Sequence, residues 1–244
     1  MSSHGKRYGE LLAKVDRERE YEPAEALELV RSLTSAKFDE TVEMHVRTGL
    51  NVRHADEQLR GTIALPNGIG KDVKIAVFAQ GDAAGEAEQA GADYVGGEDL
   101  AKRIREGFDD FDMTIATPDM MSIVGQLGRI LGPAGKMPNP KVGTVTTDVA
   151  KAVEESKAGK VEYRTDRSAI VHLVIGKASF DARKLLENYA VVVEELVRAK
   201  PAAAKGRYLR SITMASTMSP GIKLDTTRIR DLMEDAAAPA AAAV

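Results

Sequence analysis

The chain has 244 residues, 43% of them apolar and 29% charged, with a formal net charge of −3 at pH 7. That length and apolar content suffice for two ordinary domains, and no apolar run approaches the roughly 18 residues that span a bilayer, so no membrane partner is expected. The absence of cysteine and the scatter of the four histidines exclude a disulfide framework and a thiolate metal site, so we expect no metal and no cofactor.

Helix and strand signals are mixed in the first part of the chain. Charged helices are expected near 5–15 and at 23–33, where Pro23 suits a first helical turn. Between 40 and 50 apolar and polar residues alternate, which is typical of a strand with one exposed face. A further strand is expected at 61–65.

The middle of the chain has the rhythm of an α/β unit. Strands are expected at 72–79, 94–95 and 112–117, and helices at 82–90, 98–106, 119–131 and 147–157. This alternation predicts a small parallel sheet covered by helices, because parallel strands require crossover connections. The outline is Rossmann-like, but no glycine-rich fingerprint follows the first strand, so a dinucleotide site is not expected.

One segment of this middle part, GQLGRILGPAGKMPNPKVGTVTT at 125–147, contains five glycines and three of the nine prolines. It starts as a helix and cannot remain one, because proline lacks the N–H donor that a helix requires. We expect a rigid loop that displays Lys136 and Lys141. A phosphate-binding P-loop is excluded, since its lysine is followed by Ser or Thr and here Met137 stands in that place.

The last part of the chain returns to mixed signals. Strands are expected at 159–164, 169–175 and 209–217, and a long helix with an apolar stripe at 181–199. These pieces suit an antiparallel sheet backed by helices. Pro/Gly breakers stand at both borders of the middle part, and two such crossings suit one domain inserted into another. We expect a hinge there, formed by Pro66, Gly68, Gly70 and Gly159.

Charge is divided unevenly between the parts. Residues 68–159 hold ten basic against fifteen acidic residues, a net charge of −5, whereas the flanking segments together hold 24 against 22, a net charge of +2. Between 198 and 210 there are five basic residues and no acid. A solvated loop rim is the ordinary explanation of such a run, and a phosphate-binding rail is the functional one; the charge asymmetry favours the rail.

The segment at 125–147 resembles, nearly residue for residue, the signature loop of the ribosomal protein L-one family, which belongs to the mobile stalk of the large subunit beside the tRNA exit site. The resemblance continues in SAKFDETVEMHVRTGLN at 35–51, RGTIALPNGIGK at 60–71, GKVEYRTDRSAIVHLVIGKASF at 159–180 and ASTMSPGIKLD at 215–225. It implies a cytoplasmic ribosomal protein that binds stalk ribosomal RNA and exit-site tRNA. It also implies help in releasing deacylated tRNA, repression of the mRNA of its own operon, and a monomer off the ribosome.

The resemblance also implies the domain boundaries. Residues 1–67 and 160–235 are expected to form a discontinuous α+β RNA-binding domain, 68–159 an inserted Rossmann-like α/β domain, and 236–244 a disordered Ala-rich tail. A phosphate-ligand enzyme built on the middle domain is the alternative function.

By the same resemblance, RNA contacts are assigned to Phe38, Thr41, Glu43, Ser211, Thr217 and Met218, with Lys37 nearby and Ser219 and Gly221 in the same segment. Their positions in the sequence suggest a secondary RNA-facing role for His172 and Lys177 and auxiliary contacts from Lys136, Lys141 and Lys205. Hydroxyl groups and an exposed aromatic ring suit RNA, which is read through 2′-hydroxyls and unstacked bases. Composition alone favours a core position for Phe38, because Phe is commonly buried, and the resemblance reverses that preference. Likewise, threonine-rich composition by itself indicates no more than a strand.

Some residues depart from the family pattern or invite another interpretation. The family usually has glycine where this chain has Ser219, so either the RNA lies further away or the hydroxyl replaces a water. A lone His172 is more often structural than catalytic. The aspartates at 109, 110 and 112 are typical of a solvated turn. We therefore expect no catalytic residue.

Overall fold

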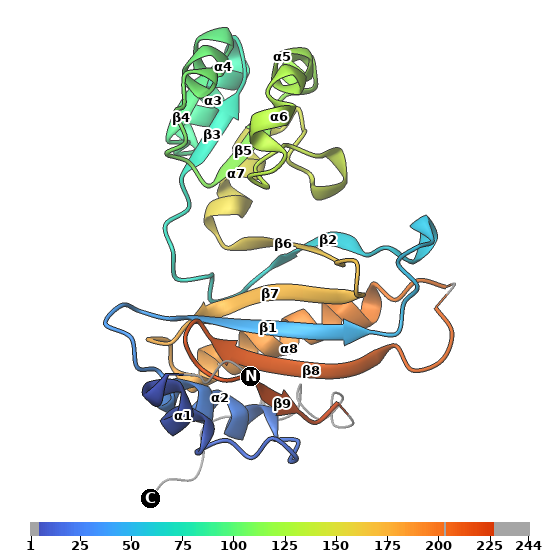
Figure 1. The fold of residues 1–244 in the computed structure, drawn as a ribbon. Coiled ribbons are helices and arrows are strands. Elements are labelled where there is room, and N and C mark those ends of the chain that lie inside the picture. Colours follow the sequence, from blue (N-terminus) through green and yellow to red (C-terminus); the bar gives the residue numbers. More distant parts are fainter. Residues whose placement is uncertain (1–4, 203, 227–244) are drawn as a thin grey trace, which may run out of the picture. The chain divides into compact units, whose positions relative to one another are not determined.

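The protein is described by a computed structural model that covers residues 5–202 and 204–226 (Figure 1). Its chain divides into two compact units. The first comprises the described residues up to Gly70 and from Val161 onward, and the second is Lys71–Lys160. The divisions thus fall after Gly70 and Lys160 instead of the expected Asn67 and Gly159. The tail expected at 236–244 lies outside the described residues.

The first unit contains a four-stranded antiparallel sheet. In sheet order its strands are β7 (Ile170–Lys177), β1 (Thr41–Thr48), β8 (Leu209–Ser216) and β9 (Ile222–Leu224). Strand β1 lies between β7 and β8, so that His45 is paired with His172 on one side and with Thr213 on the other. The antiparallel sheet expected from the flanking segments is confirmed, while β9 was not expected.

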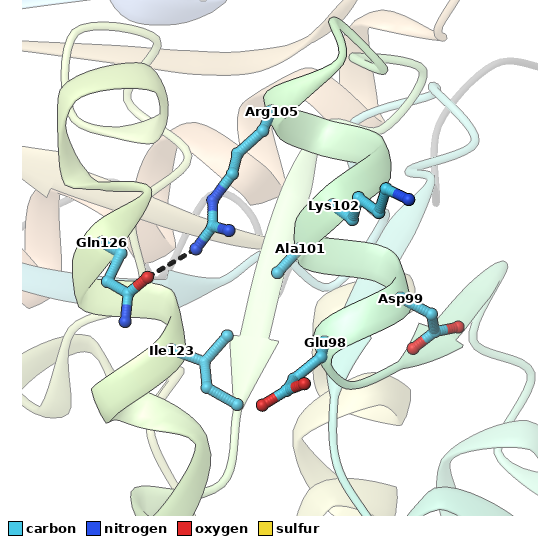
Figure 2. A pocket seen from close by; sticks show the side chains of 7 residues that line it. All are labelled: Glu98, Asp99, Ala101, Lys102, Arg105, Ile123 and Gln126. Carbon is cyan, nitrogen blue, oxygen red and sulfur yellow. Dashed lines mark hydrogen bonds between the residues drawn. The ribbon is translucent and has the colours of Figure 1, made fainter.

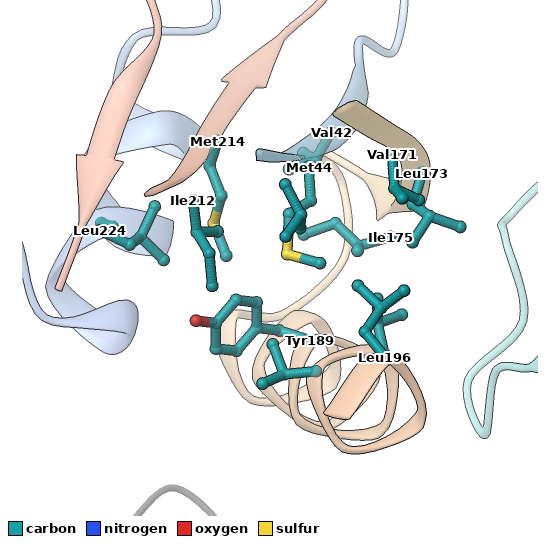
Figure 3. Packing of buried hydrophobic residues seen from close by; sticks show 14 of the residues in the cluster. Val42, Met44, Val171, Leu173, Ile175, Tyr189, Leu196, Ile212, Met214 and Leu224 are labelled. Atoms are coloured by element: carbon teal, nitrogen blue, oxygen red, sulfur yellow. The ribbon is translucent and has the colours of Figure 1, made fainter. Parts of the chain in front are cut away.

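One face of this sheet is buried, and the other is polar. Helix α8 (Ala182–Arg198) packs against β7, and α2 (Pro23–Ser32) packs against α8, β8 and β9. Met44, Met214 and Tyr189 are completely buried in the resulting core, as Figure 3 shows. Since side chains alternate across a strand, the polar residues between these apolar ones fall on the opposite face. A surface of polar side chains is therefore held on a rigid support.

The first unit is completed by short elements. They are α1 (Lys6–Leu12), the 3-10 turn η1 (Ala55–Glu57), and a two-stranded sheet of β2 (Arg60–Ala64) and β6 (Lys160–Arg164). Buried Asn188 of α8 attaches the segment after β2: its Nδ2 donates to the carbonyl of Gly68 at 3.1 Å, and its Oδ1 accepts from the N–H of Asn67 at 3.1 Å. This attachment explains why the first unit extends to Gly70.

The second unit has a parallel sheet with the order β4 (Tyr94–Gly96), β3 (Ile75–Phe78), β5 (Met113–Ala116), which confirms the expected parallel pairing. Helices α3 (Asp82–Gln89) and α7 (Val149–Lys157) contribute to one apolar cluster, and α4 (Glu98–Arg105), α5 (Met121–Gln126) and α6 (Gly128–Leu131) to another. The turns η2 (Pro118–Met120) and η3 (Pro140–Val142) complete the unit.

The helix expected at 119–131 is divided into η2, α5 and α6. The break occurs at buried Leu127, whose ψ of 0° departs from helical geometry between two glycines. Gly132 then ends the segment, and a Cβ there would lie 2.5 Å from the carbonyl oxygen of Gly128. In the described parts of the chain, no helix is both long and apolar enough to cross a membrane.

Candidate nucleic-acid interface

The carboxylate of Glu40 joins the loop before β1 to the turn after β8. One oxygen accepts hydrogen bonds from the N–H groups of Ser35 and Ala36, both at 2.9 Å. The other accepts from Ser216 Oγ at 2.6 Å and from the N–H of Met218 at 3.0 Å. Burial acts to raise the pKa of Glu40, but these hydrogen bonds outweigh it and hold the pKa below its ordinary value. The carboxylate therefore stays ionised and fixes both segments.

A second set of hydrogen bonds reaches the edge of the sheet. Thr217 Oγ1 accepts from the N–H of Thr41 at 3.0 Å, and Thr41 Oγ1 accepts from Lys177 Nζ at 2.9 Å. Three residues assigned from widely separated segments are thus neighbours at one end of the sheet. Lys177 keeps its cation at the surface, where an RNA phosphate can approach it.

Two large apolar side chains stand exposed beside this network. Phe38 is 56% exposed and Met218 39% exposed. Their segments are both tied to Glu40, so neither is a loose terminus. The core position that composition favours for Phe38 is wrong, because more than half of this residue is exposed. An exposed aromatic ring held on an ordered loop is suited to stack on an unpaired base. Lys37, next to it, is also exposed.

Ser219 closes the turn that carries Met218. Its Oγ accepts a hydrogen bond from the N–H of Ser216 at 2.8 Å and donates to the carbonyl of Pro220 at 3.2 Å. The residue does not have a positive φ, so serine is accommodated there without backbone strain. Gly221 follows, and a Cβ on it would lie 2.9 Å from Thr213 Cγ2. The hydroxyl group of Ser219 therefore stabilises its own turn.

The centre of the polar face carries a pair of histidines. Nδ1 of His45 lies 2.9 Å from Nδ1 of His172, which requires one of these nitrogens to donate and the other to accept. Glu43 Oε2 lies 3.8 Å from His45 Nε2, and Asp166 Oδ2 lies 3.5 Å from His172 Nε2. Burial and the charge of His172 lower the pKa of His45, against an opposing effect of Glu43. The folded protein therefore disfavours the positively charged form of His45.

Other assigned residues lie elsewhere. Ser211 is paired with Arg47, at the opposite end of the face from Thr217. Lys205 is exposed in the loop before β8. In the second unit Lys141 is exposed, whereas the Lys136 ammonium forms an ion pair with Asp109 and the Lys136 side chain is only 16% exposed. The structure therefore disfavours Lys136 as an RNA contact.

The basic run before β8 is partly engaged in local contacts. Arg198 forms an ion pair with Glu195, and Arg207 donates to the carbonyl of Leu209 and to Thr226 Oγ1. Lys200 lies over the ring of Tyr208. A continuous phosphate rail is thus disfavoured.

The second unit offers little to a phosphate ligand. A hollow of this unit lies between α4 and α5, where Arg105 donates to Gln126 Oε1, as Figure 2 shows. Glu98 and Asp99 stand at the N-terminus of α4, and this negative charge opposes a phosphate there. Among the described residues, no group of three or more acidic, histidine or cysteine side chains could hold a metal.

Two residues of the interface were missed by sequence reasoning. Glu40 is not among the residues assigned from the sequence, and its four donors come from segments up to 178 residues away. His45 was seen only as the polar member of an alternating pattern, and its partner lies 127 residues further on. No local signal distinguishes either residue, although period-two alternation places His45 on the polar face.

A model of the Ribosomal protein L1p/L10e family matches residues 30–220. The match spans both units and includes Glu40, Thr217 and Met218. The chain belongs to this family. It is accordingly a protein of the large ribosomal subunit in the cytoplasm that binds ribosomal RNA, in a family of structural proteins and not of enzymes.

Proposed function

We propose that this protein holds the RNA of the large-subunit stalk through one end of the polar sheet face of its first unit. The contact surface, called here the Thr217 patch, consists of Lys37, Phe38, Thr41, Lys177, Thr217 and Met218. The observation that carries the proposal is the buried Glu40 carboxylate, which holds the Phe38 loop and the Met218 turn together. A prearranged surface loses little conformational entropy on binding.

Each part of the Thr217 patch has a chemical role. Phe38 stacks on an unpaired base, and Met218 covers the neighbouring sugar or base with apolar surface. Lys177 meets a phosphate, while the hydroxyls of Thr41 and Thr217 exchange hydrogen bonds with 2′-hydroxyl groups. Glu43, being acidic, accepts from a 2′-hydroxyl or orients His45. The net charge of +2 on the flanking segments suits recognition by fitted hydrogen bonds more than by bulk charge.

Membership of the family supports finer functions, which we include in the proposal. The protein acts as a monomer off the ribosome, assists release of deacylated tRNA from the exit site while it holds the stalk, and represses translation of its own operon mRNA by binding an RNA structure that imitates the ribosomal site. The two RNAs would then compete for the same patch, and stalk RNA should displace the mRNA leader.

The test is a titration of the full chain with a stalk RNA fragment. Thr217→Val should weaken binding by on the order of 1 to 3 kcal/mol, because a desolvated RNA group is left unpaired. Thr217→Ser keeps the hydroxyl and should bind like the wild type. Thr62→Val, on β2 in the two-stranded sheet and away from the polar face, is the matched control and should have little effect.

Salt dependence separates this proposal from charge-driven binding. Lys205→Ala should weaken binding less than Thr217→Val, while lowering the slope of log affinity against log salt by about one phosphate's contribution. If Thr217→Val binds like the wild type and Lys205→Ala abolishes binding, the patch is misplaced. Specific nucleotide binding with turnover by the purified chain would instead support the enzymatic alternative.

A further inference from the structure

A basic hollow lies in the first unit, at the end of the sheet opposite to the Thr217 patch. It has a volume of about 330 Å³ and is lined by Val52, Arg53, Gln58, Arg164, Thr165, Asp166 and Arg167. Val52 and Arg53 follow β1, Arg164 ends β6, and the others except Gln58 form the turn into β7. Three arginines from two distant parts of the chain therefore surround one concave surface.

These arginines are available to a ligand. All three arginines, Arg53, Arg164 and Arg167, are exposed. None of them forms an ion pair with a residue that the structure describes. Asp166 is the one carboxylate in the lining, and its Oδ1 accepts from the N–H groups of Ser168 at 2.8 Å and Ile170 at 2.7 Å. The Asp166 carboxylate therefore binds N–H groups of its own turn. With three arginines against this one carboxylate, the hollow keeps an excess of positive charge.

The turn that presents Arg167 is constrained. Ala169 is buried and has φ of 61°, the only positive φ of a non-glycine residue in the described chain. This conformation is unfavourable for a residue with a side chain, because its Cβ comes too close to the carbonyl oxygen that follows. The turn is nevertheless held by the Asp166 hydrogen bonds, and Thr165 Oγ1 accepts from the N–H of Leu59 at 3.3 Å. Strain retained in an exposed, over-determined turn is characteristic of a binding site.

We propose that this hollow, called here the arginine site, binds a backbone phosphate of the same RNA that the Thr217 patch holds. The guanidinium group suits the task, because its planar donors match two phosphate oxygens at once. Strand β7 runs from Lys177 at the patch to Ile170 at the arginine site, which is about 23 Å at 3.3 Å per residue. One nucleotide cannot span that length, so the bound RNA lies along the whole polar face. Ser211 and Arg47 lie at the arginine end of this face. This inference rests on the proposed function.

The arginine site is tested by the salt dependence of stalk RNA binding to the full chain. Arg164→Gln and Arg167→Gln should each weaken binding roughly fivefold at about 0.1 M salt and lower the slope of log affinity against log salt by roughly 0.7 to 0.9. Arg164→Lys should restore the slope and only part of the affinity, because the charge returns without the planar fork. Arg17→Gln removes an exposed charge in the loop between α1 and α2 and should change neither quantity. Thermal melts of all variants should match the wild type, because these arginines form no ion pair with the described residues that the substitution could remove.

Two further measurements make the outcome decisive. Inorganic phosphate, added at constant ionic strength, should weaken RNA binding to the wild type but not to Arg164→Gln, because RNA and phosphate then share the hollow. If phosphate binds the wild type in an Arg164-dependent way and leaves RNA affinity unchanged, the hollow is a site for free phosphate only and the inference is wrong. If Thr217→Val weakens binding while the arginine variants bind like the wild type, the arginine site fails and the proposed function stands. If the arginine variants alone weaken binding, the Thr217 patch fails instead.

Discussion

The carboxylate of Glu40 accepts a hydrogen bond from the N–H of Met218 at 3.0 Å, across 178 residues of sequence. This contact joins the two segments that carry the exposed apolar side chains of the proposed interface. Glu40 itself is only 1% exposed, so it touches no RNA in this arrangement. Its contribution is to position Phe38 and Met218 before RNA arrives.

Replacing Glu40 should therefore weaken both the fold and RNA binding. Glu40→Gln puts an amide NH₂ where an oxygen now accepts from two donors, so buried N–H or O–H groups lose their acceptor. We expect the free energy of unfolding to fall by about 1 to 3 kcal/mol, measured by urea denaturation. Glu43→Gln, at a half-buried acid in the strand β1 that follows Glu40, should change it by less than about 0.5 kcal/mol. Equal stability of the two variants would contradict the role given to Glu40.

The histidine pair predicts a pH effect. The pKa of His45 lies below its ordinary value of 6.5 in the folded protein, so the unfolded chain binds the proton more tightly. The stability that neutral His45 contributes is therefore fully present above the pKa of His45 in the unfolded chain. It is lost as the pH falls through 6.5 and below. We expect an NMR titration to give His45 a pKa under 6.5, and His172→Asn to raise it by removing the neighbouring charge. A His45 pKa unchanged in His172→Asn would show that the two rings are not coupled.

Ser219→Gly restores the residue that the family usually has. The variant loses the acceptor of the Ser216 N–H and gains freedom in the unfolded chain, so we expect the protein to be about 1 to 2 kcal/mol less stable. RNA affinity should be kept or raised, because the hydroxyl bonds to its own turn. Ser219→Ala removes only the hydroxyl and separates the two stability effects. A large loss of affinity in both variants would mean that the hydroxyl contacts RNA.

The fold was predictable where local patterns suffice. Strand β1 was expected because Val42, Met44 and Val46 alternate with polar residues, and the structure buries all three. Strand β9 was missed because its three residues follow a Pro-Gly break and are too few to show a period. The helix expected at 119–131 is interrupted at Leu127. The apolar side chains on both sides of the break pack into a shared core, and this packing outweighs the tendency to form one continuous helix.

The interface was predictable only in part, for a related reason. Phe38 and Thr217 were assigned through resemblance. The hydrogen bonds that hold their segments in place come from Glu40, whose partners are remote in sequence. The arginine site has no sequence signature, since Arg53 and Arg164 meet only through tertiary folding. Lys136 was expected to contact RNA because it lies in a glycine-rich loop. In the structure its ammonium group instead forms an ion pair with Asp109.

The last prediction concerns the independence of the two units. Each unit has its own buried apolar clusters, so removal of residues 71–159, with Gly70 joined to Lys160 by a short glycine linker, should leave a folded protein with a cooperative melt. Removal of 68–159 should give a protein about 1 to 3 kcal/mol less stable, because the Asn188 side chain loses the Gly68 carbonyl and the core loses Ile69.

Both shortened proteins keep the Thr217 patch and should select stalk RNA over unrelated RNA at moderate salt, as measured by filter binding. The isolated middle unit, residues 71–160, should bind RNA weakly and without selectivity, because it is acidic overall and Lys136 is paired. A selective middle unit beside a folded but unselective first unit would transfer recognition to the glycine-rich loop at 125–147. The comparison separates the two locations, because removal of 71–159 takes away that loop and leaves every residue of the patch in place.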